Sequence, residues 1–288
     1  MSPSPALGAT AILLAGVVLS FSGLIVRHIE AADDWQIVFY RSLVVAISLT
    51  LLMILRDRLK FILVVRRSGW AGLCAGLSIA VSMVTFVLAI NATSVANTLF
   101  MLAAAPFLAA VLGWLLLRER LERATWVAML LALGGVGAMV WHGVTGGSLF
   151  GNAMALLTAL GFAGFSVALR FGRQTDMLPA VCFAGYASAA AAACVVSYSG
   201  SSFVLPVHEY GLCLLFGAVV ACGLGTYAFG GRAVPAAVLA LLSLTEVLLG
   251  PLWVWLLLGE VPHLMTLIGG GILLAAIVGQ ATASLGRG

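Results

Sequence analysis

The sequence predicts an all-α integral membrane protein with ten transmembrane helices, arranged as two inverted five-helix repeats, and with both termini in the cytoplasm. Composition is the first observation behind this prediction: 63% of the 288 residues are hydrophobic, 8% are charged, and the mean hydropathy is +1.18. Soluble domains carry charge on roughly a quarter of their residues. The other two observations are an internal duplication and an uneven distribution of Lys and Arg among the loops.

Ten apolar runs have the length that a membrane crossing requires, which is about 20 residues for a helix. No Lys or Arg precedes the first run, so we interpret it as a helix that stays in the membrane and not as a signal peptide. The predicted spans are 7–27, 36–55, 69–89, 94–117, 124–141, 151–172, 179–199, 209–230, 235–258 and 264–284.

The duplication relates a segment that ends at Glu119 to a segment that ends at Glu260. At an offset of 141 residues the two acids align, Trp114 aligns with Trp255, and the run LLL lies shortly before each acid. The chain therefore consists of two related halves.

The two predicted domains, residues 1–145 and 146–288, contain five helices each. Because five is an odd number, the second domain enters the membrane from the side opposite to the first, and the duplication is inverted. Inverted repeats of this kind are the architecture of many secondary transporters, whose substrate site lies near the membrane midplane between the repeats. This feature is the first that indicates a function.

Lys and Arg are concentrated in alternate loops. Twelve lie on the side of the two termini, Arg27 lies in the opposite set of loops, and Arg41 lies inside the second span. Cytoplasmic loops retain Lys and Arg, so both termini are predicted to be cytoplasmic. The twelve residues are Arg56, Arg58, Lys60, Arg66, Arg67, Arg118, Arg120, Arg123, Arg170, Arg173, Arg232 and Arg287.

Cysteine and histidine do not show the clustered spacing of a metal or redox site. The five cysteines lie singly inside the spans, and the four histidines lie at the non-cytoplasmic span ends. We therefore expect no metal and no cofactor. The net charge of +4 is divided among loops, so we expect no nucleic-acid partner.

Glu246 is an acid in the middle of the apolar span 235–258. It lies roughly 16 Å along the helix from Pro235, where a charged side chain costs on the order of 3 kcal/mol and is tolerated mainly when it faces a cavity or a partner. Two interpretations stay open. Glu246 lines a central cavity and binds an ammonium group or a proton, or it is a protonated packing residue that is hydrogen-bonded to Ser243.

A continuous helix would place several residues on the same face as Glu246. At helical spacing these are Leu239, Ser243, Gly250 and Trp253. Trp253 is therefore the aromatic candidate for contact with an apolar substrate.

Two prolines predict helix bends. Pro251 cannot donate to the carbonyl of Val247, and Pro106 cannot donate to the carbonyl of Leu102. We expect a bend or an exposed polar backbone group at each place.

Polar stripes follow other spans. Ser78, Ser82 and Thr85 recur at helical spacing in the third span, Tyr227 lies in the eighth, and Ser20 lies in the first. Each stripe is explained either by lining of a pore or by close packing of small residues.

Arg41 lies about 9 Å beyond Trp35 along the second span. Its guanidinium group has two candidate roles: capture of a carboxylate, or structural pairing with Glu30, Asp33 or Asp34. The structural role is favoured. Elsewhere, glycine tracts at 134–137 and 269–271 are expected to pack the two repeats, or two protomers, together.

Short motifs carry a resemblance to a known family. They are the runs NATSVAN at 91–97, VPAA at 234–237, SLTE at 243–246 and LLLGE at 256–260. With these motifs, the chain resembles the EamA-type carriers of the drug/metabolite transporter superfamily over nearly its whole length. It departs from the family where Glu246 is followed by Val247 and not by Pro. Among members it is most similar to bacterial exporters of amino acids, including aromatic ones.

The resemblance and the inverted repeats together predict a secondary transporter that exports small organic solutes, most plausibly amino acids, by alternating access across a bacterial inner membrane. The expected partners are a small-molecule substrate and the lipid bilayer, and the oligomeric state is left open. A carrier for another metabolite or drug is the alternative. An integral-membrane enzyme acting on lipids is less favoured, because such chemistry needs clustered catalytic groups, so the chain is not expected to be an enzyme. The candidate substrate-binding residues are Glu246, Ser243, Trp253, Ser78, Ser82, Thr85, Tyr227, Asn97, Thr98 and Ser20.

Overall fold

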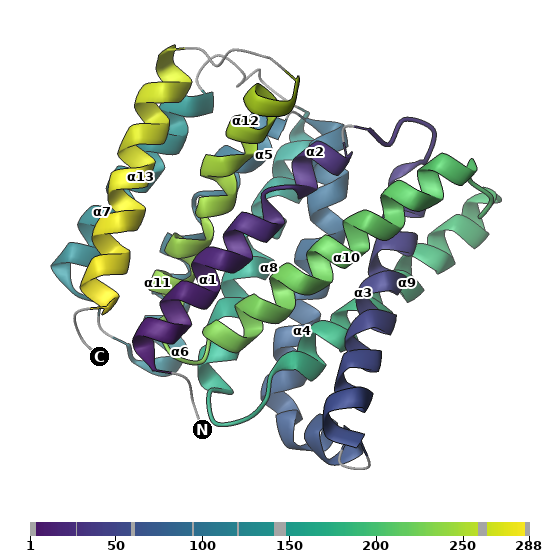
Figure 1. The fold of residues 1–288 in the computed structure, drawn as a ribbon, viewed down its shortest axis with the longest axis horizontal. Helices are drawn as coiled ribbons and strands as arrows, with labels where there is room; N and C mark the ends of the chain where they lie inside the picture. Colours follow the sequence, from purple (N-terminus) through teal and green to yellow (C-terminus); the bar gives the residue numbers. More distant parts are fainter. Residues whose placement is uncertain are drawn as a thin grey trace.

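The computed structural model describes residues 4–26, 28–58, 61–93, 95–119, 121–140, 148–258 and 264–285, and all regular elements in these residues are helices (Figure 1). They are α1 (Pro5–Leu19), α2 (Ser22–Val26), α3 (Asp34–Asp57), α4 (Phe61–Ala92), α5 (Val95–Leu102), α6 (Ala105–Leu117), α7 (Arg123–Val140), α8 (Leu149–Phe171), α9 (Leu178–Ser199), α10 (Val207–Gly230), α11 (Ala236–Ser243), α12 (Thr245–Leu258) and α13 (Leu264–Leu285).

Eight segments of the described chain are long and apolar enough to cross a membrane. In three of them two helices form one span: α1 with α2, α5 with α6, and α11 with α12. Shorter apolar stretches lie in α7 (Arg123–Ala138) and α13 (Leu267–Thr282). The helical, multi-pass class is confirmed, and the ninth and tenth crossings stay a prediction.

Helices from the first and second halves of the chain lie side by side (Figure 1). Helix α4 packs on α8 and α1 packs on α10, while α3 packs on α9, α7 on α13, and α6 on α11. The core is therefore shared by both halves.

Glycines permit these close approaches. A Cβ atom added at Gly161 of α8 would lie 2.7 Å from the carbonyl oxygen of Ser78 on α4. One added at Gly135 of α7 would lie 2.8 Å from the carbonyl oxygen of Gly269 on α13, whereas one added at Gly134 would meet no atom within 4 Å. Small residues of this kind let membrane helices approach backbone to backbone.

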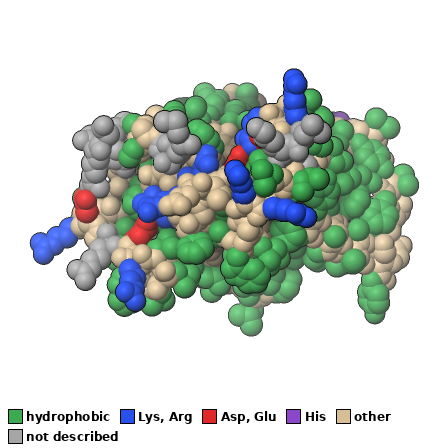
Figure 2. Space-filling view, turned by 90° about the horizontal axis from the view of Figure 1, so that it is seen from below, with side chains coloured by type: hydrophobic (Ala, Val, Ile, Leu, Met, Phe, Trp, Pro, Cys, Tyr) green, Lys and Arg blue, Asp and Glu red, His purple; other side chains and the backbone are tan. Residues whose placement is uncertain are grey.

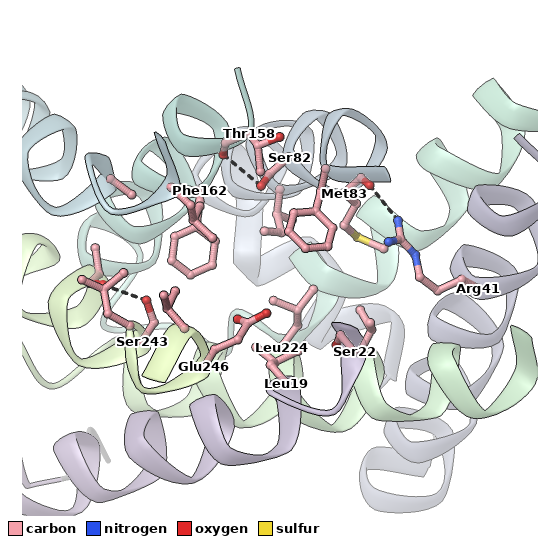
Figure 3. A pocket seen from close by; sticks show the side chains of 18 of the residues that line it. Leu19, Ser22, Arg41, Ser82, Met83, Thr158, Phe162, Leu224, Ser243 and Glu246 are labelled. Atoms are coloured by element: carbon pink, nitrogen blue, oxygen red, sulfur yellow. Dashed lines mark hydrogen bonds between the residues drawn. The ribbon is translucent and has the colours of Figure 1, made fainter. Parts of the chain in front are cut away.

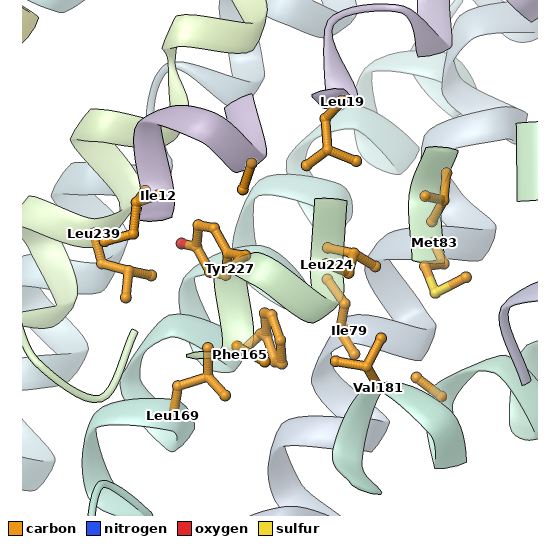
Figure 4. Close-up of a cluster of buried hydrophobic side chains, with 14 of the residues drawn as sticks. Ile12, Leu19, Ile79, Met83, Phe165, Leu169, Val181, Leu224, Tyr227 and Leu239 are labelled. Atoms are coloured by element: carbon orange, nitrogen blue, oxygen red, sulfur yellow. The ribbon is translucent and has the colours of Figure 1, made fainter. Parts of the chain in front are cut away.

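Tyr227 occupies the packed centre between α1, α8 and α10 (Figure 4). Its ring is fully buried and stacks on Phe165 at 5.7 Å between centroids, and its hydroxyl lies 2.8 Å from Oγ of Ser166. The hydrogen bond satisfies the polar group, which would otherwise be costly to bury. Tyr227 is therefore a core residue in this structure.

Helices α11 and α12 are separated at Leu244, and two hydroxyl groups flank this interruption. Ser243 donates to the carbonyl of Ala240 at 2.7 Å, and Thr245 donates to the carbonyl of Leu242 at 2.8 Å. Such side-chain bonds compete with the helical backbone ladder. The interruption thus lies seven residues before Pro251, where we had placed the bend, and α12 continues through Pro251, whose side chain lies outside the described residues.

The equivalent interruption in the first half lies between α5 and α6, at Ala103 and Ala104. Pro106 follows in the first turn of α6, where a missing N–H has no helical partner to lose. Helices α5 and α11 end at Leu102 and Ser243, which are 141 residues apart, the offset of the sequence duplication.

The predicted loop 56–68 is partly helical. Helix α4 already begins at Phe61, eight residues before the predicted span, and is kinked at Gly69, which has a φ of 53°. A positive φ is readily adopted by glycine. The chain can therefore change direction at Gly69 and enter the longer apolar run.

The start of α1 and the end of α13 lie at the same edge of the molecule (Figure 1). Figure 2 views the molecule from this edge and shows Lys and Arg side chains gathered on it, beside apolar surface. The edge is basic, as the loop count predicts.

Candidate functional site

A cavity of about 80 Å³ lies where the three interrupted spans meet (Figure 3). The residues that flank the interruptions and line the cavity are Leu19, Ser22, Leu102, Ala105, Ser243, Leu244 and Glu246. Helices α3, α4, α8 and α10 complete the wall through Arg41, Ile79, Ser82, Met83, Phe86, Thr158, Phe162, Phe216, Val220 and Leu224, with Ala240 and Val247 also contributing.

Glu246 extends its carboxylate into this cavity (Figure 3). Within the described residues the carboxylate has no hydrogen bond and no ion pair. Ser243, the partner considered from the sequence, donates instead to the carbonyl of Ala240. The geometry favours the cavity-lining interpretation of Glu246 over the packing one.

Arg41 also lines the cavity, and its side chain is only 2% exposed. The Nη2 group donates to the carbonyl of Met83 at 2.8 Å, the guanidinium lies 5.0 Å from the centroid of the Phe216 ring, and Nε has no hydrogen-bond partner. In the described chain, Arg41 forms no salt bridge.

Two of the three acids expected beside Arg41, namely Asp33 and Asp34, have other contacts. Asp33 accepts the backbone N–H groups of Trp35 and Gln36 and caps α3, and Asp34 accepts a hydrogen bond from Asn91. The prediction that Arg41 pairs with one of the acids before it in the chain was therefore wrong. Proximity along the chain does not bring these acids to a guanidinium that points inward to α4 and α10.

Ser82 and Thr158 bring α4 and α8 together at the cavity wall. Ser82 donates to the carbonyl of Thr158 at 3.0 Å, and the hydroxyls of Thr85 and Thr158 lie 2.8 Å apart. Of the predicted stripe, Ser82 lines the cavity, while Ser78 and Thr85 contact α8 outside the lining.

Trp253 and Ser20 lie away from the cavity lining and bind each other. Trp253 donates through Nε1 to Oγ of Ser20 at 2.7 Å, and its ring stacks on Phe21 with centroids 4.6 Å apart. These contacts fasten α12 to the interruption between α1 and α2. Trp253 lies on α12 seven residues after Glu246, about 10 Å further along the helix, and it is therefore beyond the cavity that Glu246 lines.

Of the two remaining predicted residues, one does not line the cavity and the other has a side chain that is not among the described ones. Thr98 is fully buried in α5 and does not line the cavity, and the side chain of Asn97 lies outside the described residues. Sequence reasoning missed Thr158 and Phe162, which are one turn apart on α8. The signal available was a pair of hydroxyl residues, Thr158 and Ser166, in the apolar run 151–172.

The described residues contain no group of three or more His, Cys, Asp or Glu side chains that would hold a metal ion. The ionisable side chains among the residues lining the cavity are Glu246 and Arg41. The arrangement offers one carboxylate and one guanidinium to a bound molecule.

These features define a multi-pass membrane protein whose interrupted helices surround an internal polar site. Residues 6–141 match the EamA-like transporter family.

Relatives span nearly the whole chain. The pseudopaline exporter CntI of Pseudomonas aeruginosa strain UCBPP-PA14 is 27% identical over 272 residues, covering 92% of this chain and 93% of the relative. The CntI protein of strain PAO1 is 26% identical over the same length and coverage. A solved crystal structure of a protein shares the fold with a TM-score of 0.79 at 18% identity, covering 96% of this chain and 98% of that one.

Proposed function

We propose that this protein is a secondary transporter that exports small organic solutes, with amino acids as the first candidates, across the bacterial inner membrane. The observation that carries the proposal is the meeting of three interrupted spans at a cavity that holds Glu246 and Arg41. Interrupted helices free backbone polar groups and build the substrate sites of many secondary transporters.

Inverted five-helix repeats, residues 1–145 and 146–288, account for the helix pairing. When each helix is replaced by its counterpart in the other half, the packed pair α4 and α8 becomes the pair α10 and α1. This second pair is packed as well. The same replacement leaves α3 with α9 and α7 with α13 paired as before. The shared position of the interruptions at an offset of 141 residues supports the same symmetry.

The size of the cavity supports transport by alternating access. A volume of about 80 Å³ is well below the roughly 300 Å³ at which pockets begin to hold organic ligands. The described conformation must therefore widen before substrate enters, and rocking of one repeat against the other is the movement such repeats allow.

The basic edge in Figure 2 supports a cytoplasmic position for both termini, because cytoplasmic loops retain Lys and Arg. Exported substrate would then enter the cavity from this edge. We expect no enzymatic step, since the cavity presents one carboxylate and one guanidinium but no nucleophile with a neighbouring base.

The curated relatives favour a second candidate substrate. Both are exporters of pseudopaline, so pseudopaline or a compound like it is the alternative to a simple amino acid.

Counterflow in proteoliposomes tests the function. Vesicles containing the purified protein and a high internal concentration of unlabelled solute are given trace labelled solute outside, with amino acids, sugars and pseudopaline as the panel. We expect accumulation of labelled amino acid above that of protein-free vesicles. Accumulation of pseudopaline alone would replace the first candidate with the second, and accumulation of sugars alone would reject both.

A further inference from the structure

Arg41 is a buried cation without an acidic partner in the described chain. It is 2% exposed, one of its nitrogens donates to Met83, and Nε has no acceptor. A buried charge that is not paired is costly, and an unmet buried donor adds a further cost. Such a residue requires a compensating group, and the cavity it lines is where one would bind.

Glu246 presents the complementary situation at another part of the same wall. Figure 3 shows its carboxylate on α12 directed into the cavity and Arg41 approaching from α3 on another side. Glu246 and Arg41 do not form an ion pair with each other in the described structure. The cavity thus presents a negative and a positive group to whatever occupies it.

The other acid near this region is already engaged. Glu209 of α10 accepts the backbone N–H groups of Glu30 and Ala31 through Oε1, at 3.1 and 3.2 Å. Its Oε2 has no partner, and no salt bridge joins it to Arg41. Glu209 is therefore fixed to the loop before α3 and does not line the cavity.

We propose that Arg41 is the carboxylate-binding residue of the transport site and that Arg41 and Glu246 together select substrates carrying both a carboxylate and an ammonium group. The proposal rests on the transport function proposed above and specifies its substrate class. A guanidinium presents its N–H groups in a planar fork that matches a carboxylate, and Glu246 accepts from the ammonium group. The apolar side chains of Phe86, Phe162 and Leu224 surround the remainder of the substrate.

The expected selectivity follows from the charged side chain that each incomplete ligand leaves unpaired. A simple amine would leave Arg41 buried and unpaired, and a simple carboxylic acid would leave Glu246 unpaired. Only a molecule with both groups compensates both charges. We expect each incomplete analogue to bind at least about ten-fold more weakly, because sites built for polar contacts reject ligands that leave those contacts unmet.

Competition binding to the purified full-length protein tests this. The probe is labelled L-phenylalanine, and the competitors are unlabelled L-phenylalanine, phenethylamine, which lacks the carboxylate, and 3-phenylpropionate, which lacks the ammonium group. We expect wild-type protein to prefer phenylalanine over both analogues. Equal competition by all three would overturn the proposal without any variant, while labelled amino acid counterflow would still support the transport function.

Variants then assign the groups. Arg41→Met keeps an unbranched apolar side chain without the guanidinium, and it should reduce the preference for phenylalanine over phenethylamine about ten-fold while leaving the rejection of 3-phenylpropionate intact. Arg41→Lys keeps the charge and should retain part of the preference. Arg67→Gln, an exposed arginine on α4, is the control. An unchanged ratio of amine to zwitterion binding in a well-folded Arg41→Met protein would exclude Arg41 as the carboxylate site.

Discussion

The carboxylate of Glu119 lies 2.7 Å, from Oε1 to Nε, from the guanidinium of Arg170. The same carboxylate accepts the backbone N–H of Ala236 at 3.4 Å through Oε2, and Arg170 donates to the carbonyl of Arg232 at 3.2 Å. The end of α6 is thereby joined to α8 and to the beginning of α11. In an alternating-access transporter, a link of this kind between the two halves stabilises closure of the basic edge.

Glu119→Gln should weaken this closure. Both side chains are about one-fifth exposed, so we assign the pair about 1 kcal/mol, which corresponds to about a five-fold change in population. The measurement is the rate at which a water-soluble maleimide labels a cysteine placed at Ala240, which lines the cavity, in a background without the native cysteines. We expect labelling about five-fold faster than in the parent. Glu30→Gln, an exposed acid, is the control, and an unchanged rate in Glu119→Gln would contradict the closing role.

Trp253→Phe should affect stability and spare substrate binding. Phenylalanine preserves the stack on Phe21 but removes the N–H that donates to Ser20, a loss of about 1 kcal/mol. Thermal unfolding in detergent should shift down by a few degrees, with substrate affinity unchanged. Trp255→Phe, at a more exposed position on α12, should change neither quantity. A large loss of affinity in Trp253→Phe would show that this indole reaches the substrate after all.

Two adjacent glycines of α7 should respond in opposite directions to alanine. The Cβ atom of Gly135→Ala would press on the backbone of α13, at 2.8 Å from Gly269 and 2.9 Å from Leu273, and such overpacking costs about 1–3 kcal/mol. Gly134→Ala meets no atom within 4 Å and gains helix propensity of up to about 1 kcal/mol. The measurement is the thermal stability of the two variants side by side. Equal effects of the two substitutions would show that α7 and α13 do not pack at Gly135.

Glu246 illustrates what could be predicted from the sequence. An acid in the middle of an apolar span is a local property of the chain, and its cost in a membrane already favours a position on a cavity. The interrupted segments were predicted from Pro106 and Pro251, whereas α5 and α11 end at Leu102 and Ser243, which occupy matched positions in the two halves.

Trp253 and Arg41 illustrate what could not be predicted. Trp253 shares α12 with Glu246 but lies about 10 Å further along it, where its indole contacts Ser20 and Phe21 from a distant part of the chain. The acceptor of Arg41 is a carbonyl 42 residues away, at Met83. Tertiary contacts of this kind leave no periodic pattern in the sequence.

The most direct test of the transport site is counterflow by Glu246→Gln in proteoliposomes, with Glu246→Asp as the variant that keeps the charge. The neutral amide cannot pair with an ammonium group or exchange a proton, so we predict that labelled amino acid accumulates at least about ten times more slowly than with wild-type protein at equal incorporation. Glu246→Asp should retain part of the activity. Counterflow by Glu246→Gln at the wild-type rate, from acidic to alkaline pH, would contradict the account.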